Sequence, residues 1–465
     1  MMVVLKFGGT SVADADAIAR VVAIVGERRG PRTVVVSALA GTTDALLDIA
    51  AVAAQDAERA RAALAELVRR HHDVAAAVTD PARRHQLGAD IEGFARTVTR
   101  GIDRIAAGGV TAPLVDTLLA AGELWSSRIV AARLADEGMA SHWIDARSLI
   151  RTDARHGSAA PDFAATEEAV SRLIRPALAL DRVVVVGGFV GSSPSGETTT
   201  LGRGGSDYSA AIVGACLQAD EIEIWTDVDG VLSADPRVVA DARVLPALSY
   251  ADAHVLASFG AKVLHPKTIE PAAARGIPVV VRNSRRPAEP GTRIDAHGAG
   301  DGQVAAVASR AGVSLVQIVA RRSPAPDGAQ GTPGSFAALA FQSLSDAGVS
   351  VVVGEFSDDR LTVVVDESFD LEGFRARVAL FADVRVRAGL AAVCAVGDRL
   401  TSEPQLVTDA FGVFNDASVH FVSRSNGRTS FAVIVDDRDA HGLVTRLHDH
   451  FRVGLFAATE AAVVR

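Results

Sequence analysis

The chain begins with a stretch whose residues could bind phosphate. In KFGGTSV (6–12) a lysine and two glycines follow a short apolar run and precede a helical pattern. Consecutive glycines let backbone N–H groups approach a ligand closely, and a helix N-terminus adds positive potential. The lysine precedes the glycines, so the stretch matches neither a Walker A loop nor GxGxxG. A Gly–Gly pair alone more often marks a tight turn, but Lys6 at the end of an apolar strand requires an anion.

A second glycine-rich stretch could bind a small anion. TTTLGRGGSD (198–207) places Arg203 between two glycine groups. A guanidinium can hold a carboxylate through two parallel hydrogen bonds, which a lysine cannot do. We expect Ser206 and Asp207 to begin the helix that follows.

Other polar residues follow further apolar runs. Thr42 and Thr43 lie in SALAGTTD, where they could donate hydrogen bonds to a ligand or simply cap a helix. Glu123 follows a glycine, and we expect it in the first turn of an apolar helix. A carboxylate there could complement the helix dipole or bind the ammonium group of a substrate.

Two later stretches add candidates for a nucleotide site. WTDVDGVLSADPR (225–237) supplies Thr226 and Arg237, and SFGAKVLHP (258–266) carries Lys262 beside a glycine. The DVDG letters look like a calcium loop, but the later ligand positions and the closing glutamate are missing. We therefore expect phosphate chemistry here and no protein-bound metal.

The elements that must position these residues are predicted to be buried parallel strands. Continuous apolar runs of this kind are typical of strands covered by helices on both faces. Ligands bind at the carboxyl ends of such strands, which is where the polar stretches lie. A helix over Ala13–Arg28, capped by Thr10 or Ser11, would complete a first βαβ unit. The predicted strands are Val3–Lys6, Thr33–Ser37, Val183–Val186, Ile222–Trp225 and Val279–Val281.

The rest of the chain divides into a helical insertion and a repeated C-terminal part. Residues 48–110 have a helical composition, and within them His71 and His72 are expected on a solvated face, because adjacent side chains do not converge on a metal. We expect a catalytic domain at 1–295. Two βαββαβ modules are predicted beyond it, at 307–389 and 390–465. Small tandem modules behind such a domain suggest regulation.

Composition excludes several classes of partner. The 465 residues carry a formal net charge of −9, which argues against nucleic acid and anionic membranes. No stretch of about 18 uncharged apolar residues is present. Only two cysteines occur, and the N-terminus does not read as a signal peptide, so we expect a cytoplasmic protein.

Four of these motifs together resemble those of the aspartokinases, which belong to the amino-acid kinase superfamily. The four motifs are KFGGTSV, LGRGGSDYSAA, WTDVDGVLSADPR and FGAKVLHP. The resemblance extends from residue 3 to about 295, and the C-terminal modules look like the paired ACT domains of those enzymes. It implies an α/β fold with a mostly parallel sheet covered by helices. It also implies transfer of phosphate from ATP to L-aspartate, which gives 4-phospho-L-aspartate for lysine, threonine and methionine synthesis.

The resemblance also assigns roles to individual residues. It places Lys6, Asp207 and Lys262 in catalysis, with Asp207 orienting the lysines. The predicted aspartate site consists of Thr43, Glu123, Arg203, Gly204, Gly205 and Ser206. The predicted nucleotide site consists of Lys6, Phe7, Gly8, Gly9, Thr226, Asp227, Leu232, Arg237, Lys262 and Val263.

The charges of the reactants indicate how such a transfer proceeds. The acceptor carboxylate is already anionic at neutral pH, so no general base is needed. Cations and positioning should supply most of the catalysis, because an anion approaches a polyanion. The negative charge that develops on the transferred phosphoryl group would be neutralised by Lys6, Lys262 and Mg²⁺ carried with the nucleotide. No covalent enzyme intermediate is required.

Two other interpretations remain open. The acceptor could be acetylglutamate, glutamate, carbamate or UMP, although Glu123 with Arg203 favours an amino acid with a free ammonium group. The chain could also be a non-catalytic amino-acid sensor, although Lys6, Asp207 and Lys262 would then have no reason to be present. We further expect a homodimer or larger homo-oligomer through the ACT-like modules, and an amino-acid effector bound to them.

One departure from the family predicts altered regulation. Lysine-sensitive aspartokinases tend to carry SVD in the first ACT module, whereas this chain has Ser350, Val351 and Val352. A charged hydrogen bond contributes roughly 1.5–3 kcal/mol, so its loss should weaken lysine binding about ten- to a hundredfold. We expect weak or absent inhibition by lysine alone, with threonine or concerted inhibition as the alternative. Assays with lysine, threonine and both decide this, and half-inhibition by sub-millimolar lysine alone would contradict it.

Overall fold

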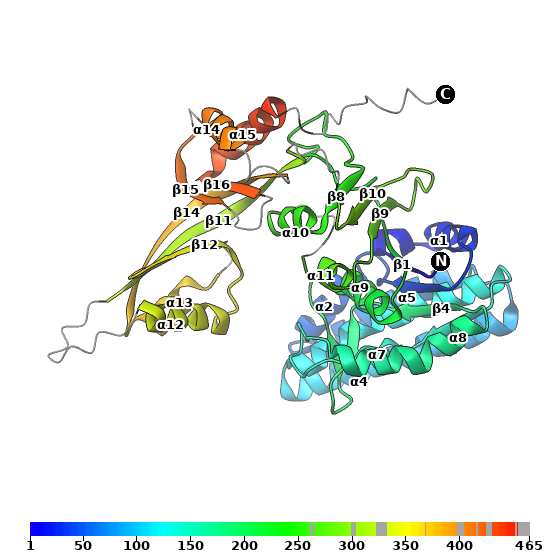
Figure 1. Cartoon of the computed structure of the whole chain (residues 1–465). Coiled ribbons are helices and arrows are strands. Elements are labelled where there is room, and N and C mark those ends of the chain that lie inside the picture. Colours follow the sequence, from blue (N-terminus) through cyan, green and yellow to red (C-terminus); the bar gives the residue numbers. More distant parts are fainter. Residues whose placement is uncertain are drawn as a thin grey trace, which may run out of the picture. The chain divides into compact units, whose positions relative to one another are not determined.

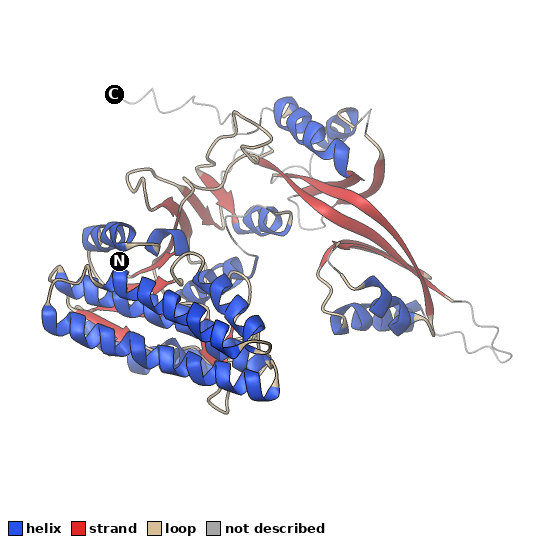
Figure 2. Cartoon of the chain, turned by 180° about the vertical axis from the view of Figure 1, so that it is seen from behind, coloured by secondary structure: helices blue, strands red, loops and turns tan. Residues whose placement is uncertain are grey.

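The computed structural model describes most of the chain as two compact units (Figures 1 and 2). The first unit comprises Met1–Val231, Pro246–Tyr250 and Val263–Gly298, and the second comprises Leu232–Leu245, Ala251–Lys262 and Ala299–Arg465. The described residues are 1–260, 264, 266–298, 304–321, 333–367, 369–397, 404–414, 417–424, 430–451 and 453.

The first unit is built on an eight-stranded, mostly parallel sheet. Its strand order is β3-β4-β2-β1-β7-β9-β10-β8, and the β9–β10 pair is antiparallel. The prediction of a buried parallel sheet is confirmed, because every residue of β1 is buried and β1 pairs in parallel with both β2 and β7. The strands are β1 (Val3–Phe7), β2 (Arg32–Val36), β3 (Ser141–Ile144), β4 (Val183–Gly187), β7 (Glu221–Thr226), β8 (Ala247–Ser249), β9 (Val279–Asn283) and β10 (Thr292–Asp295).

The first connection differs in detail from the sequence prediction. Thr10 and Ser11 lie within a short 3₁₀ helix, η1 (Gly9–Val12), so neither caps the following helix. That helix, α1 (Ala15–Glu27), is capped by Asp14, whose carboxylate accepts a hydrogen bond of 2.8 Å from the Ala17 N–H. The predicted cap was wrong because the chain forms a 3₁₀ turn directly after β1, and this turn includes both Thr10 and Ser11.

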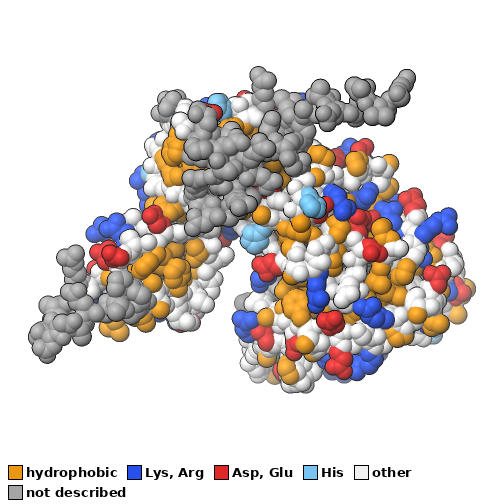
Figure 3. Space-filling model, viewed as in Figure 1, with side chains coloured by type: hydrophobic (Ala, Val, Ile, Leu, Met, Phe, Trp, Pro, Cys, Tyr) orange, Lys and Arg blue, Asp and Glu red, His pale blue; other side chains and the backbone are white. Residues whose placement is uncertain are grey.

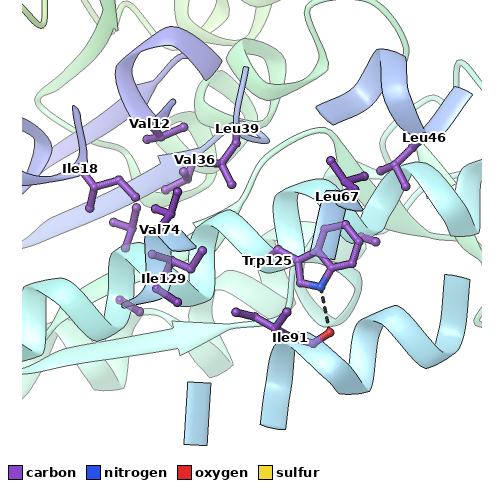
Figure 4. Packing of buried hydrophobic residues seen from close by; sticks show 14 of the residues in the cluster. Val12, Ile18, Val36, Leu39, Leu46, Leu67, Val74, Ile91, Trp125 and Ile129 are labelled. Carbon is purple, nitrogen blue, oxygen red and sulfur yellow. Dashed lines mark hydrogen bonds between the residues drawn. The ribbon is translucent and has the colours of Figure 1, made fainter. Parts of the chain in front are cut away.

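A bundle of long helices forms most of the insertion after β2. It consists of α2 (Thr42–Ala53), α3 (Ala57–Ala75), α4 (Pro81–Gly108) and α5 (Ala112–Asp136). Trp125 of α5 is fully buried at its centre, and its indole N–H donates to the Ile91 carbonyl at 3.0 Å (Figure 4). Apolar side chains from the bundle and from the sheet pack together in this cluster.

The prediction of a solvated His71 was wrong. His71 lies on the face of α3 that packs into the core, and its ring lies 4.6 Å from the Trp125 ring. Its Nδ1 is 2.7 Å from the Leu67 carbonyl oxygen, and burial lowers the pKa of the imidazole to about 4. His72 is partly exposed and pairs with Glu92.

Shorter elements complete the first unit. The two-stranded sheet of β5 and β6 is antiparallel, and β6 forms the first three residues of the glycine-rich stretch at 198–207. Helix α9 begins at Gly205, within that stretch and one residue before the predicted start at Ser206. These elements are β5 (Val190–Ser192), β6 (Thr198–Thr200), α6 (Ala146–Leu149), α7 (Phe163–Leu173), α8 (Arg175–Ala179), α9 (Gly205–Leu217) and α11 (Pro266–Ala274), while α10 (Tyr250–Ser258) runs across the boundary between the units.

The second unit contains a six-stranded antiparallel sheet with the order β12-β13-β11-β14-β16-β15. Both β11 and β14 are 15 residues long. The module boundaries at 389 and 390 stay a prediction. The elements are β11 (Ala306–Ala320), β12 (Val351–Ser357), β13 (Arg360–Asp366), β14 (Ala382–Val396), β15 (Val419–Arg424), β16 (Ser430–Asp436), α12 (Pro333–Asp346), α13 (Leu371–Val378), α14 (Pro404–Gly412) and α15 (Asp437–His450).

The second unit also includes part of a stretch that was assigned to the nucleotide site. Ala234 and Val239 belong to the same hydrophobic cluster as residues of α15 and β16. The Ser233 hydroxyl lies 3.1 Å from His448 Nε2, and the Ser233 carbonyl accepts a hydrogen bond from the Val307 N–H at 2.8 Å.

None of the described helices is both long enough and apolar enough to cross a membrane.

Candidate active site

A cavity of about 690 Å³ in the first unit brings together residues from distant parts of the sequence. Its lining comes from the turns after β1 and β2, from one face of α5 and from the N-terminus of α9. Many predicted site residues line it, namely Lys6, Gly9, Thr43, Glu123, Arg203, Gly204, Gly205, Ser206 and Asp207.

Lys6 and Asp207 form an ion pair in this cavity. The Lys6 ammonium lies 2.5 Å from Asp207 Oδ1, and the lysine side chain is only 9% exposed. Lys6 is on β1, between β2 and β7, and Asp207 lies in the first turn of α9. A buried ammonium group is costly without a partner, so the pair fixes the lysine in the wall of the cavity.

The turn after β1 approaches the neighbouring loop very closely. A Cβ atom on Gly9 would lie 3.0 Å from the Ala38 carbonyl oxygen, so a larger residue would push the two turns apart. The Ala40 N–H donates to the Gly9 carbonyl at 3.2 Å, and the Ser37 N–H donates to the Phe7 carbonyl at 3.0 Å. Both turns therefore form one rigid edge of the cavity.

Arg70 holds these two turns from outside, and no motif in the sequence pointed to it. It lies on α3, and its guanidinium donates to the Ala40 carbonyl at 2.8 Å and to the Ala13 carbonyl at 3.3 Å. One side chain thus ties the segment after η1 to the loop after β2. The sequence offered no signal for this role, because Arg70 stands in a run of charged helical residues.

The N-terminus of α9 presents a glycine turn to the cavity. Gly204 adopts a left-handed conformation, with φ of 71°, and no side chain caps the helix. Backbone N–H groups at such a terminus are available to an anion. The Arg203 side chain is exposed, and within the described residues no carboxylate pairs with it. This end of the cavity therefore has the chemistry to bind a carboxylate.

Glu123 lies in the middle of α5, not in its first turn as the sequence suggested. The helix begins eleven residues earlier, because the apolar pattern extends upstream of the glycine. Gly122 and Gly187 let neighbouring segments pack tightly here: a Cβ on Gly122 would lie 2.8 Å from Ala38 Cβ, and one on Gly187 would lie 3.0 Å from the Glu123 carbonyl oxygen.

The Glu123 carboxyl group is 3% exposed, and its Oε2 has no hydrogen-bond partner among the described residues. Burial raises its pKa to about 8, although hydrogen bonds from the Ala38 and Glu123 backbone and the charge of Lys6 act in the opposite direction. A buried acidic group without a full set of partners is well suited to a cationic ligand.

Thr43 lines the cavity, and the simpler interpretation as a helix cap is not what the structure shows. Gly41 occupies the N-cap position of α2, with φ of 76°. Thr42 is fully buried, and its hydroxyl has no hydrogen-bond partner among the described residues. Only Thr43 of the two therefore faces the cavity.

The predicted nucleotide residues are less closely gathered. The Phe7 side chain is buried against Trp225, with ring centroids 6.1 Å apart, so only its backbone could reach a ligand. Thr226 is the last residue of β7 and Asp227 follows it, at the same sheet edge as Gly8. Leu232 and Arg237 belong to the second unit, where Arg237 pairs with Asp235. Lys262 and Val263 lie outside the described residues, so these assignments stay predictions.

Ser284 was missed because its stretch looked like a domain boundary. It follows β9, and its hydroxyl lies 2.8 Å from the Ser11 hydroxyl. Its backbone N–H donates to the Thr226 carbonyl at 2.8 Å. Ser284 therefore joins the turn after β1 to the end of β7. Such a link between residues 273 positions apart leaves no local signal in the sequence.

Comparison with known proteins identifies the class of fold. The family described as "Amino acid kinase family" matches residues 1–283. A crystal structure of Escherichia coli aspartokinase III in complex with aspartate and ADP is 30% identical, covers 97% of this chain and 100% of its own, and has a TM-score of 0.85. The same enzyme in complex with lysine and aspartate has a TM-score of 0.76.

Curated relatives narrow the class further. Lysine-sensitive aspartokinase 3 of Escherichia coli is 32% identical over 97% of this chain and 99% of its own length. A bifunctional aspartokinase/homoserine dehydrogenase of Arabidopsis thaliana is 29% identical, and this chain spans 50% of its length. The chain belongs to the amino acid kinase family and, within it, to the aspartokinases, as the sequence motifs predicted.

The raised pKa of Glu123 predicts a pH-dependent affinity for aspartate. With a pKa of about 8 the free enzyme holds this group mostly protonated at pH 7, whereas an ammonium ligand needs the carboxylate. The aspartate KM should therefore fall as pH rises toward 8, by up to about tenfold per unit, and then level off. Initial rates between pH 6 and 9 at saturating ATP measure this.

The matched control is Glu123→Gln, which keeps the shape of the side chain without its charge. This variant should have a high aspartate KM with little dependence on pH over the same interval, because the titrating group is gone. If the aspartate KM of the wild type and that of Glu123→Gln changed with pH in the same way, Glu123 would not be the group that titrates.

Proposed function

We infer that the chain transfers the γ-phosphoryl group of ATP to the side-chain carboxylate of L-aspartate, which gives 4-phospho-L-aspartate and ADP. This is the first step of the pathway to lysine, threonine and methionine. The observation that carries the proposal is a single cavity that holds the Lys6–Asp207 pair, the buried Glu123 and the exposed Arg203. The family of the chain and the aspartate and ADP bound to its E. coli relative support it.

Aspartate recognition uses two opposite charges at the two sides of the cavity. Glu123 binds the ammonium group of the substrate. The attraction between the two charges offsets the free-energy cost of ionising a buried carboxyl group. Arg203 binds a carboxylate through two parallel hydrogen bonds, supported by the backbone N–H groups of Gly204, Gly205 and Ser206. Thr43 adds a hydroxyl from the loop after β2. An acceptor without a free ammonium group would leave Glu123 without its partner.

The transfer needs positioning and positive charge from the protein. An oxygen of the acceptor carboxylate attacks the γ-phosphorus, the bond to the bridging oxygen breaks, and ADP leaves with that oxygen. Lys6 stabilises the charge on the transferred group, and Asp207 holds its ammonium in place. Lys262, which lies outside the described residues, is proposed to supply a second positive charge. The glycines at 8 and 9 admit the phosphates close to the backbone.

We propose that Mg²⁺ accompanies the nucleotide. Magnesium sites in kinases combine one or two carboxylates with waters and substrate phosphates, so no dedicated protein cage is required. Asp207 lines the cavity next to Lys6 and fits this pattern. Bound there, the ion would supply positive charge to the phosphates.

The second unit is proposed to bind an amino-acid effector and to form contacts between copies of the chain. The E. coli relative is named lysine-sensitive, and one of its structures contains lysine. In this chain Val352 stands on β12, an edge strand of the six-stranded sheet. Apolar side chains gather on parts of the surface of this unit (Figure 3). Phe341 of α12 and Phe356 of β12 are 49% and 40% exposed. These features support a homo-oligomer through this unit. We also propose that the protein acts in the cytoplasm.

An acceptor assay tests the proposed reaction. ADP release should depend on L-aspartate and should be slow with acetylglutamate, glutamate, carbamate or UMP. A non-catalytic sensor would release no ADP with any of them. Faster turnover with another acceptor than with aspartate would assign the chain a different substrate.

Arg203→Lys tests the carboxylate clamp. Lysine keeps the positive charge but loses the planar fork, so the aspartate KM should rise by about ten- to a hundredfold. The ATP KM should stay within about twofold, because the nucleotide binds elsewhere in the cavity. A weakened ATP affinity with an unchanged aspartate KM would move Arg203 to the nucleotide site.

A further inference from the structure

Asp116 is a buried carboxylate in the cavity wall that the proposed reaction does not use. It lies on α5 seven residues before Glu123, so both side chains fall on the same face of the helix. It is 1% exposed and lines the same cavity. A carboxylate so deeply buried needs a full set of partners.

Those partners come from two segments that are distant in sequence. The Thr200 hydroxyl donates to Asp116 Oδ1 at 2.6 Å, and the Thr200 N–H donates to Oδ2 at 3.2 Å. The Gly157 N–H lies 3.1 Å from both oxygens, and His156 Nδ1 lies 2.9 Å from Oδ2. These donors fill the acceptor positions of one carboxylate, so Asp116 has none left for a substrate.

The two segments held by Asp116 lie on either side of the turn that carries Arg203. Thr200 is the last residue of β6, three positions before Arg203. Gly157 packs directly on Gly202, because a Cβ on Gly202 would lie 3.0 Å from the Gly157 carbonyl oxygen. The Ala159 N–H also donates to the Thr200 carbonyl at 2.9 Å, which locks the two segments to each other.

We propose that Asp116 is the positioning residue of the carboxylate clamp. It anchors the start of the Arg203 turn to the helix that carries Glu123, and so fixes the distance between the two charges that recognise the substrate. This inference rests on the proposed aspartate kinase activity. A clamp already in place loses less freedom on binding, and a shift of its charge by 1 Å costs affinity and selectivity.

Asp116→Asn tests the proposal, since an amide of the same shape puts an NH₂ group against the donors of Thr200, Gly157 and His156. We expect the aspartate KM to rise about tenfold or more, while kcat and the ATP KM stay within about twofold. The preference for aspartate over glutamate should fall as well, because the spacing of the two charges sets it.

The matched control is Asp136→Asn on the same helix. The Asp136 side chain is only 2% exposed and also accepts several hydrogen bonds, from Thr79, Asp80, Arg83 and Arg133, but it does not line the cavity. This variant should lower the melting temperature and leave the aspartate KM unchanged. A rise in the aspartate KM for Asp116→Asn alone would support the positioning role.

Two results would overturn the inference. One is a folded Asp116→Asn protein with the aspartate KM of the wild type, and the other is a loss of kcat with both KM values unchanged, which a merely structural role would give. If Asp116→Asn does not fold, Thr200→Val decides: it removes one donor, and an unchanged aspartate KM would overturn the role. Failure of the proposed function is distinct, because the wild type would then release no ADP with aspartate.

Discussion

The structure of the cavity depends on the ion pair between Lys6 and Asp207. It joins the central strand of the first sheet to the first turn of α9, and both groups are largely buried. Removing either partner leaves an uncompensated charge in the cavity wall. The loss of folding free energy is then larger than the stabilisation that the intact pair contributes. The glycine turns on both sides of the pair are therefore held at the edge where a phosphate and a carboxylate can meet.

Around this pair the protein arranges its charges before a substrate arrives. Arg70 and Ser284 hold the turns that follow β1, β2 and β7, and they do so through backbone carbonyls and a hydroxyl. Burial raises the pKa of Glu123 to about 8, so this group is largely protonated at pH 7. Phosphoryl transfer relies on positioning and charge more than on covalent chemistry, so such an arrangement is what the reaction requires.

Local patterns in the sequence were sufficient to predict the parallel strands and nine of the described residues that line the cavity. Apolar runs followed by glycines, lysine or arginine marked β1, β4 and the start of α9 correctly. Long-range packing could not be predicted in this way. His71 is buried because α3 packs on Trp125, and β11 and β14 extend far beyond their apolar runs because each pairs with two neighbours. Asp116 depends on partners 40 and 84 residues away.

The most direct test of the central role of the ion pair is the turnover of Lys6→Ala at saturating ATP and aspartate. Its charge is most useful where negative charge develops in the transition state. We predict a fall in kcat of about 10²-fold or more, with a much smaller change in the aspartate KM. A Lys6→Ala enzyme with the kcat of the wild type would contradict the account and remove Lys6 from the active site.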